Sequence, residues 1–180
     1  MNARPLFQRL LLAATLLFGA LAQAQPQPLE TPDQDFLEQA AHNARAEMSA
    51  GRLALTKARH PRVRTFAQRM IDEHTLIDTD LRALATDHGF DPPQEPSALQ
   101  KGKEMMIGGL GDDTFDRRYM NQMGVEAHTS YIQLFENAAR DARHPDVKAF
   151  ASRHLRTLRE HLEIARSLKA EVDRGNTPAK

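Results

Sequence analysis

The stretch VRTFAQRMIDEHTLIDTDLRAL, residues 63–84, decides the fold. Its apolar side chains recur at alternating three- and four-residue spacing, which is typical of a helix that buries one face. These side chains are Val63, Phe66, Met70, Ile77, Leu81 and Leu84. The stripe continues between Met70 and Ile77 through His74, whose polar ring costs free energy to bury unless it has a partner. The stretch therefore predicts a core helix and a candidate site at once.

The first 24 residues have the pattern of a secretory signal peptide. Two arginines precede an apolar run over residues 10–22, and Ala22-Gln23-Ala24 fits a cleavage site. The run is shorter than the roughly 20 residues that a membrane-spanning helix needs. We therefore expect export to the periplasm, cleavage after Ala24 and no transmembrane anchor. A Pro/Gln-rich linker without helical periodicity is expected over residues 25–32.

Composition limits the class of protein. The chain has 24 Lys and Arg, of which the first 24 residues hold two, so 22 remain after cleavage against 24 Asp and Glu. This balance does not favour nucleic acid or an anionic lipid surface as the main partner. With no cysteine there are no disulfides and there is no thiol chemistry. The absence of tryptophan and the few strand-forming runs favour one all-α domain over residues 33–174, followed by a disordered tail at 175–180.

Proline and glycine divide this domain into four long helices. We expect them at about residues 33–59, 61–88, 112–140 and from 145 onward, with Thr31 or Asp33 capping the first. A 22-residue connection, 90–111, joins the second helix to the third and includes a short helical piece near 97–106. Fully extended it reaches roughly 70 Å. A helix of about 27 residues is only roughly 40 Å long, so the connection can cross the whole bundle.

The two short turns are copies of one another. Residues 58–69 match residues 142–153 at eight of twelve positions, and both copies contain Ala-Arg-His-Pro. Two helical hairpins joined by a long crossover form the plan of the ferritin-like four-helix bundle. A simple up-down bundle is the alternative.

One polar residue that can ligate a metal lies near the midpoint of each long helix. These residues are Glu47, His74, His128 and His161. Their distances from the turns predict that all four lie near one level of the bundle. One carboxylate and three imidazoles suit a four-coordinate site for zinc, copper or iron. A closed network in which Glu47 accepts from two of the rings, without metal, and a small-molecule pocket both stay open.

The spacing excludes a di-iron ferroxidase of the usual kind. That chemistry needs Glu-x-x-His on two helices, but Ile71 and Leu158 stand three residues before His74 and His161. Glu73 precedes His74 directly, and adjacent helical residues diverge by about 100°, so we expect it at the margin of the stripe or in solvent. A mononuclear oxidoreductase would need an open coordination position, which no pattern here indicates. We assign no catalytic residue.

Other polar candidates have simpler explanations. His60 and His144 are turn residues, and the methionines are core residues. His154 lies two turns before His161, where it either extends the polar level or packs near the second turn. If histidine ligates a metal, affinity should fall as the pH approaches the ordinary histidine pKa of about 6.5.

Several segments in order resemble the bacterial family called domain of unknown function 4142. They are Asp35-Phe36, Glu47 before Gly51-Arg52-Leu53-Ala54, Val63-x-x-Phe66-Ala67, Met70-Ile71-Asp72-Glu73-His74, Phe115-Asp116-Arg117-x-Tyr119, Glu126-x-His128 and His161. The resemblance covers about residues 33–170, and the family's usual aspartate before the helix-two histidine is Glu73 here. It implies a ferritin-like bundle, often periplasmic or envelope-associated, and no established activity. Any family function would fall here on Glu47, His74, His128 and His161.

We therefore expect a non-enzymatic exported bundle that binds one transition-metal ion, in metal buffering or envelope stress. The alternative is a structural or protein-interaction module whose polar level only fixes the register of the helices. An envelope protein partner and a homo-oligomer are both compatible with either role.

Overall fold

The structure of the protein is a computed structural model that describes residues 28–175. The expected signal peptide, residues 25–27 of the expected linker and residues 176–180 lie outside this part of the chain. Within it every regular element is a helix, as predicted, and none is long and apolar enough to cross a membrane. The elements are α1 Thr31–Lys57, α2 Pro61–Asp87, α3 Ala98–Gly108, α4 Asp112–Tyr119, the π-helix η1 Met120–Ala127, α5 His128–Asp141 and α6 Pro145–Gly175.

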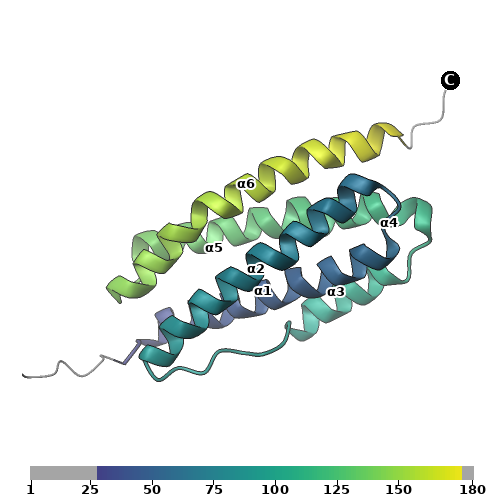
Figure 1. Cartoon of the computed structure of the whole chain (residues 1–180). Coiled ribbons are helices and arrows are strands. Elements are labelled where there is room, and N and C mark those ends of the chain that lie inside the picture. The colour runs from purple at the N-terminus through teal and green to yellow at the C-terminus, as the bar shows by residue number, and fades with distance from the viewer. Residues whose placement is uncertain (1–27, 176–180) are drawn as a thin grey trace, which may run out of the picture.

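The helices form two hairpins joined by a long crossover. α1 packs along α2, α5 packs along α6, and α4, η1 and α5 follow one another as a single long rod (Figure 1). The Asp116 carboxylate in α4 accepts a hydrogen bond from the His60 backbone amide, 2.8 Å away, just before α2. The third rod therefore begins where α2 begins and runs parallel to it. This confirms the long-crossover plan and excludes the up-down alternative.

The two turns are held by a reciprocal exchange of aspartates. Asp33, at the start of α1, accepts hydrogen bonds from the backbone amides of Arg143 and His144, at 3.0 and 2.7 Å. Each hairpin thus satisfies amides at the turn of the other, where the first amides of a helix lack intrahelical partners. The expectation that Asp33 or Thr31 caps α1 is wrong. The cap residue is Glu30, without a side-chain cap bond, because the Asp33 carboxylate is committed to the second turn.

The ends of α2 and α3 follow their sequence signals. Gly89 has φ 67°, and the Gly89 and Phe90 amides bond to the carbonyls of Thr86 and Ala85, a Schellman motif at the end of α2. Ser97 and Gln100 form a capping box that begins α3. The helical piece that we predicted inside the connection is therefore present, and it lies along α1.

The connection is anchored to the bundle by arginine. Arg82 donates to the carbonyls of Pro92 and Pro93 and also pairs with Asp78. Asp78 in turn accepts from Arg45 of α1 at 2.7 Å. A buried carboxylate shared by two guanidiniums therefore ties α1, α2 and the crossover together.

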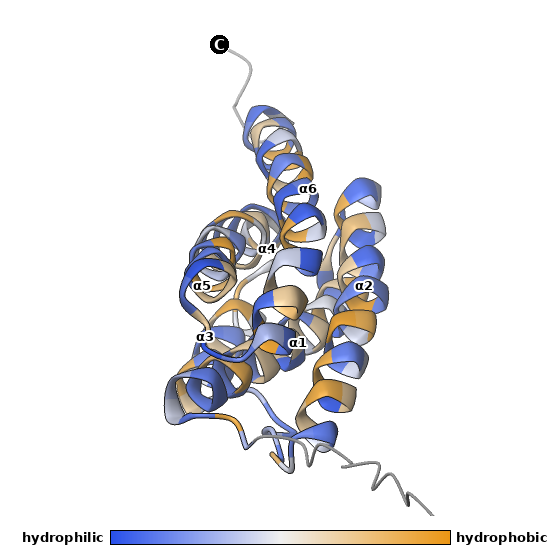
Figure 2. Cartoon of the chain, turned by 90° about the vertical axis from the view of Figure 1, so that its left-hand side faces the viewer, coloured by the Kyte–Doolittle hydropathy of each residue, from blue (hydrophilic) through white to orange (hydrophobic). Residues whose placement is uncertain are grey.

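The apolar core has two parts, one at each end of the bundle, and helix faces alternate between polar and apolar residues along their length (Figure 2). One part gathers around Phe36, Phe135 and Phe150, and the other around Phe66, Phe115 and Tyr119. The buried histidines of the candidate site belong to neither cluster.

The π-helix η1 was not predicted, and it changes which face of the third rod is buried. Burial falls on Phe115 and Tyr119 before η1 and on Met123 within it, and it resumes at His128 rather than at Ala127. A π turn holds one more residue than an α turn and so shifts the buried stripe by one position. The buried stripe therefore takes a five-residue step from Met123 to His128, and that step directs His128 into the core.

Candidate metal centre

The structure brings three of the four predicted residues together. His74 of α2, His128 at the start of α5 and His161 of α6 each offer a ligand atom, and these atoms lie within 4.8 Å of one another. The three side chains are buried, with exposed fractions of 2%, 0% and 0%. The Nε2 atoms of His74 and His128 are 3.5 Å apart. In a tetrahedral zinc site, bonds of about 2.0–2.1 Å separate two ligand nitrogens by about 3.4 Å, so this spacing fits a shared ion.

The tautomer of His128 leaves its Nε2 free to ligate. Its Nδ1 lies 3.0 Å from the Met123 carbonyl oxygen in η1, an acceptor, so Nδ1 carries the proton. The Nε2 lone pair then points toward His74. The π-helix therefore both directs the ring inward and provides the carbonyl that orients it, as the outer partners of metal-bound histidines do.

His161 is oriented by a carboxylate. Its Nε2 lies 2.6 Å from Glu73 Oε2, and Glu73 Oε1 accepts from Arg69 at 2.6 Å. The proton therefore resides on Nε2, which leaves the Nδ1 lone pair available. Glu73 lies at the margin of the stripe, as expected, because its side chain is 28% exposed. Its reach across to His161 was not foreseen, since it depends on how closely α6 approaches α2.

Burial keeps the three rings neutral. Desolvation, reinforced by the neighbouring His161, lowers the pKa of His128 to about 3 against the opposing effect of backbone acceptors. Desolvation also places the pKa of His74 well below its ordinary value, reinforced by His128 and His161. The pKa of His161 is lowered by burial, against the opposing effect of Glu73. Neutral imidazole is the form that binds metal, so the site is ready to ligate well below pH 6.5.

Glu47 does not join this cluster. It is fully buried, yet its carboxyl group is not among the ligand atoms that lie within reach of the three rings. Its polar neighbours are Tyr131, whose hydroxyl interacts with the carboxyl group, and Tyr119. Burial raises the pKa of Tyr119, and the nearby Glu47 raises it further. Desolvation holds the pKa of Glu47 well above its ordinary value. At the level of the histidines this residue is therefore a neutral acid beside two tyrosines.

Several buried polar atoms around the cluster have no hydrogen-bond partner within residues 28–175. They are both carboxyl oxygens of Glu47, Nδ1 of His74, Nδ1 of His161 and the Tyr119 hydroxyl. Leaving such an atom without a partner costs about 1–3 kcal/mol. The closed network in which Glu47 accepts from two histidines is therefore not what these side chains form. The donor set suits a cation that the nitrogen lone pairs would share.

A groove leads from the surface toward this cluster. Its volume is about 680 Å³, and it lies between α3 and the η1–α5 segment, with Lys103, Met106 and Ser130 among its lining residues. Asn43 and Tyr131 line the groove and also a small space beside His74, so these two side chains lie between the groove and the cluster.

The remaining histidine candidates lie elsewhere. The Nε2 atom of His154 lies 3.2 Å from the Asp80 carboxylate and its ring packs on Phe150, so it does not extend the cluster. His60 lies beside Glu171 at 3.4 Å. Met70, Met120 and Met123 are buried among apolar side chains, as expected of core residues.

Comparison with known proteins agrees with the fold. The model of a family described as "Domain of unknown function (DUF4142)" matches residues 18–168. Among solved structures, the crystal structure of a DUF305 fragment from Deinococcus radiodurans superposes with a TM-score of 0.70. That match has 14% sequence identity and covers 80% of this chain and 99% of that chain, so the likeness concerns the fold alone. No curated protein matches this chain.

Proposed function

Since the chain belongs to the family described as domain of unknown function 4142, which names no activity, we propose its function from the geometry: the protein holds one transition-metal ion on His74, His128 and His161. The observation that carries this proposal is the convergence of three buried, neutral imidazoles whose ligand atoms lie within 4.8 Å. Zinc, copper and iron all accept imidazole ligands. The carboxyl group of Glu47 lies outside this set and stays a neutral acid, because burial raises its pKa well above the ordinary value.

Two features of the surroundings support an ion at this place. Glu73 and the Met123 carbonyl fix the tautomers of His161 and His128, which is the role of outer partners in metal sites. The Nδ1 atom of His161, which is buried without a partner, would gain one in the ion. Burial of all three ligands favours slow release, so we propose retention or buffering of the ion. With the export signal expected at residues 1–24, the place of action is the periplasm, and mass analysis of the mature chain should find it beginning at Gln25.

The test is the metal content of the mature chain, residues 25–180, purified without a chelator or a histidine tag. We expect about one equivalent of a single metal that survives brief dialysis against a chelator. The ion should be lost in a His74→Ala variant and kept in a His42→Ala variant, whose ring lies on the surface beside the Glu95 carbonyl. A helical circular-dichroism spectrum in both variants controls for folding. Absence of metal after challenge with zinc, copper and iron refutes the proposal.

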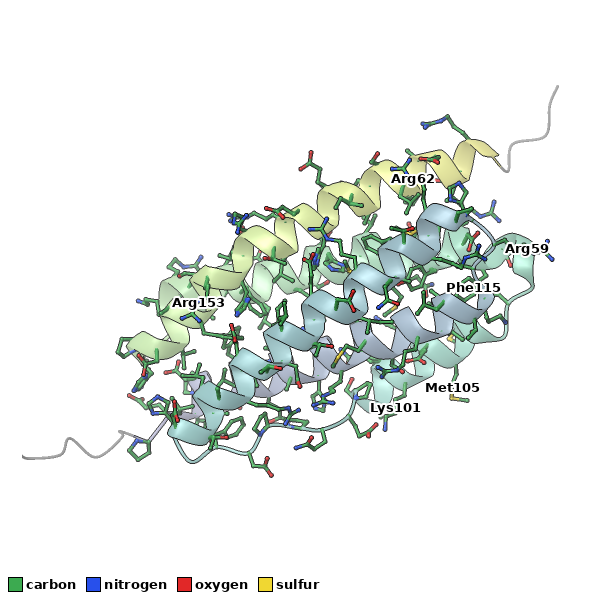
Figure 3. The ribbon with its side chains drawn as sticks, in the orientation of Figure 1. Arg59, Arg62, Lys101, Met105, Phe115 and Arg153 are labelled. Atoms are coloured by element: carbon green, nitrogen blue, oxygen red, sulfur yellow. The ribbon has the colours of Figure 1, made fainter. Side chains whose placement is uncertain are left out.

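The second candidate is an interaction module, and the exposed face of α3 favours it. Leu99, Met105 and Met106 are 70–78% exposed on a helix of 11 residues, and Met105 projects away from the bundle (Figure 3). Large apolar side chains gathered on one exposed helix indicate a contact with a partner. This candidate predicts that Met105→Ser changes self-association or partner binding, while the His74→Ala variant binds the partner as the parent does.

A further inference from the structure

A second group of metal-competent side chains lies at the end of the bundle where α2 ends and α6 begins. His88 is the C-cap residue of α2, and His144 and Asp146 flank Pro145 at the start of α6. Their three ligand atoms lie within 4.8 Å of one another. None of them belongs to the buried triad, which lies near the middle of the same helices.

The distances within this group match those between ligands of one ion. Asp146 Oδ2 is 3.1 Å from His88 Nε2 and 3.8 Å from His144 Nδ1, and the two rings have centroids 4.2 Å apart. The single lone pair of His144 Nδ1 accepts a hydrogen bond from the Asp146 amide at 3.2 Å, so an ion on this nitrogen would replace that bond. Two imidazoles and a carboxylate form a common ligand set for zinc.

The surroundings hold this group in place and leave it accessible. The side chains of His88 and His144 are only 7% and 15% exposed, while Asp146 is 60% exposed and opens the site to solvent. Asp33 binds the His144 amide and so fixes the backbone that carries the second ring. The C-terminal end of α2 adds the negative end of a helix dipole, which opposes the positive end of α6.

The internal repeat provides a comparison inside the same molecule. At the first turn the residue equivalent to Asp146 is Arg62, which pairs with Glu171, and His60 lies 3.4 Å from the same carboxylate (Figure 3). There a guanidinium supplies the positive charge between the helix ends. At the second turn an aspartate replaces it, and among the described residues this aspartate pairs with the two histidines and with no lysine or arginine.

We propose that His88, His144 and Asp146 bind a second divalent transition-metal ion, of the zinc class, which links the end of α2 to the start of α6. Solvent completes the coordination, so this ion exchanges readily, unlike one held by the buried triad. It joins the two hairpins, and its binding stabilises the folded state by an amount that rises with the logarithm of the free ion concentration once that exceeds Kd.

The test uses zinc and the mature chain carrying His74→Ala, so that the buried triad does not contribute. We expect one zinc bound by titration calorimetry, released by a chelator within minutes, and a zinc-dependent rise in melting temperature. Both effects should disappear in His88→Ala and in Asp146→Asn, and both should remain in His42→Ala. A parallel experiment without zinc measures what the ion pair alone contributes to stability.

Each outcome decides the proposal. The proposal is supported if His88→Ala and Asp146→Asn, each made in the His74→Ala chain, bind one zinc fewer than that chain does. It is overturned if all three proteins bind the same number of zinc ions. If His88→Ala lowers the melting temperature equally with and without zinc, the group is a structural ion pair and the proposal is wrong. Because the triad is disabled throughout, these results are independent of whether the buried centre holds an ion.

Discussion

Acid should destabilise the protein when a chelator keeps it free of metal, and His128 should account for a measurable share of the effect. Burial lowers its pKa from 6.5 to about 3 in the folded state. Between these values the unfolded chain binds more protons than the folded one, so stability falls as the pH falls. The contribution of neutral His128 is therefore complete above about pH 6.5 and is lost progressively toward pH 3.

The size of the loss follows from the same two values. One pKa unit corresponds to about 1.36 kcal/mol, so full protonation of His128 costs the fold about 5 kcal/mol. Between pH 7 and pH 5 the linkage relation gives about 2 kcal/mol for this residue alone. His74, whose pKa burial also places well below its ordinary value, acts in the same direction. Glu47 acts in the opposite direction, because its raised pKa favours the folded state as the pH falls.

The assay is urea unfolding followed by circular dichroism at pH 7, 6 and 5, comparing the parent with His128→Gln. Comparing the change in unfolding free energy from pH 7 to 5 cancels the contribution of Glu47 and the larger, desolvation part of the contribution of His74, since both proteins contain these residues. We expect the variant to lose about 2 kcal/mol less than the parent over this interval. A His42→Gln control should keep the parental pH dependence. Equal losses in parent and His128→Gln would show that His128 is not buried and neutral, and would refute the reasoning.

Three further predictions concern the frame around the site. Asp33→Ala and Asp116→Ala should each lower the unfolding free energy by about 1–3 kcal/mol, because each leaves a turn amide unsatisfied. Since they lie at opposite ends of the bundle, their effects in the double variant should add within about 0.5 kcal/mol; a larger deviation would contradict independent turns. Gly51→Ala should lower the stability of the fold by about 1–3 kcal/mol, because the new Cβ would lie 2.8 Å from Ile71 Cγ1. Thermal melts measure this loss, and an unchanged melting temperature would mean that α1 and α2 do not approach so closely. A bulky maleimide attached to Ser130→Cys, in the groove, should slow zinc uptake by the triad. The same label on Thr129→Cys, which lies on the same helix but outside the groove, should leave the rate unchanged. Equal rates in the two labelled proteins would place the access route elsewhere.

Local signals were sufficient to predict the helices and their ends. The apolar spacing of residues 63–84, the two His-Pro turns and Gly89 act within a few residues, and the structure places helix ends where these signals predict them. The crossover plan also followed from sequence, since only a long connection can join parallel helices. The structure moves the start of α1 to Thr31, two residues before the expected domain boundary, because Pro32 is tolerated in a first turn.

Contacts between distant segments decided the rest. Within η1, Gly124 packs closely against Ala165 of α6, a contact that no local pattern records. The Glu73–His161 pair and the reciprocal aspartates join residues that are 88 and more than 50 positions apart. Four residues at one level of a bundle still differ in the direction in which they point, and that is why three histidines meet while Glu47 turns to the tyrosines. The composition and periodicity of this chain thus determined its helices and the level of its polar residues along the bundle. Only the packing of helix against helix determined which of these polar residues share a site, because the direction of a side chain at the midpoint of a helix depends on every turn before it.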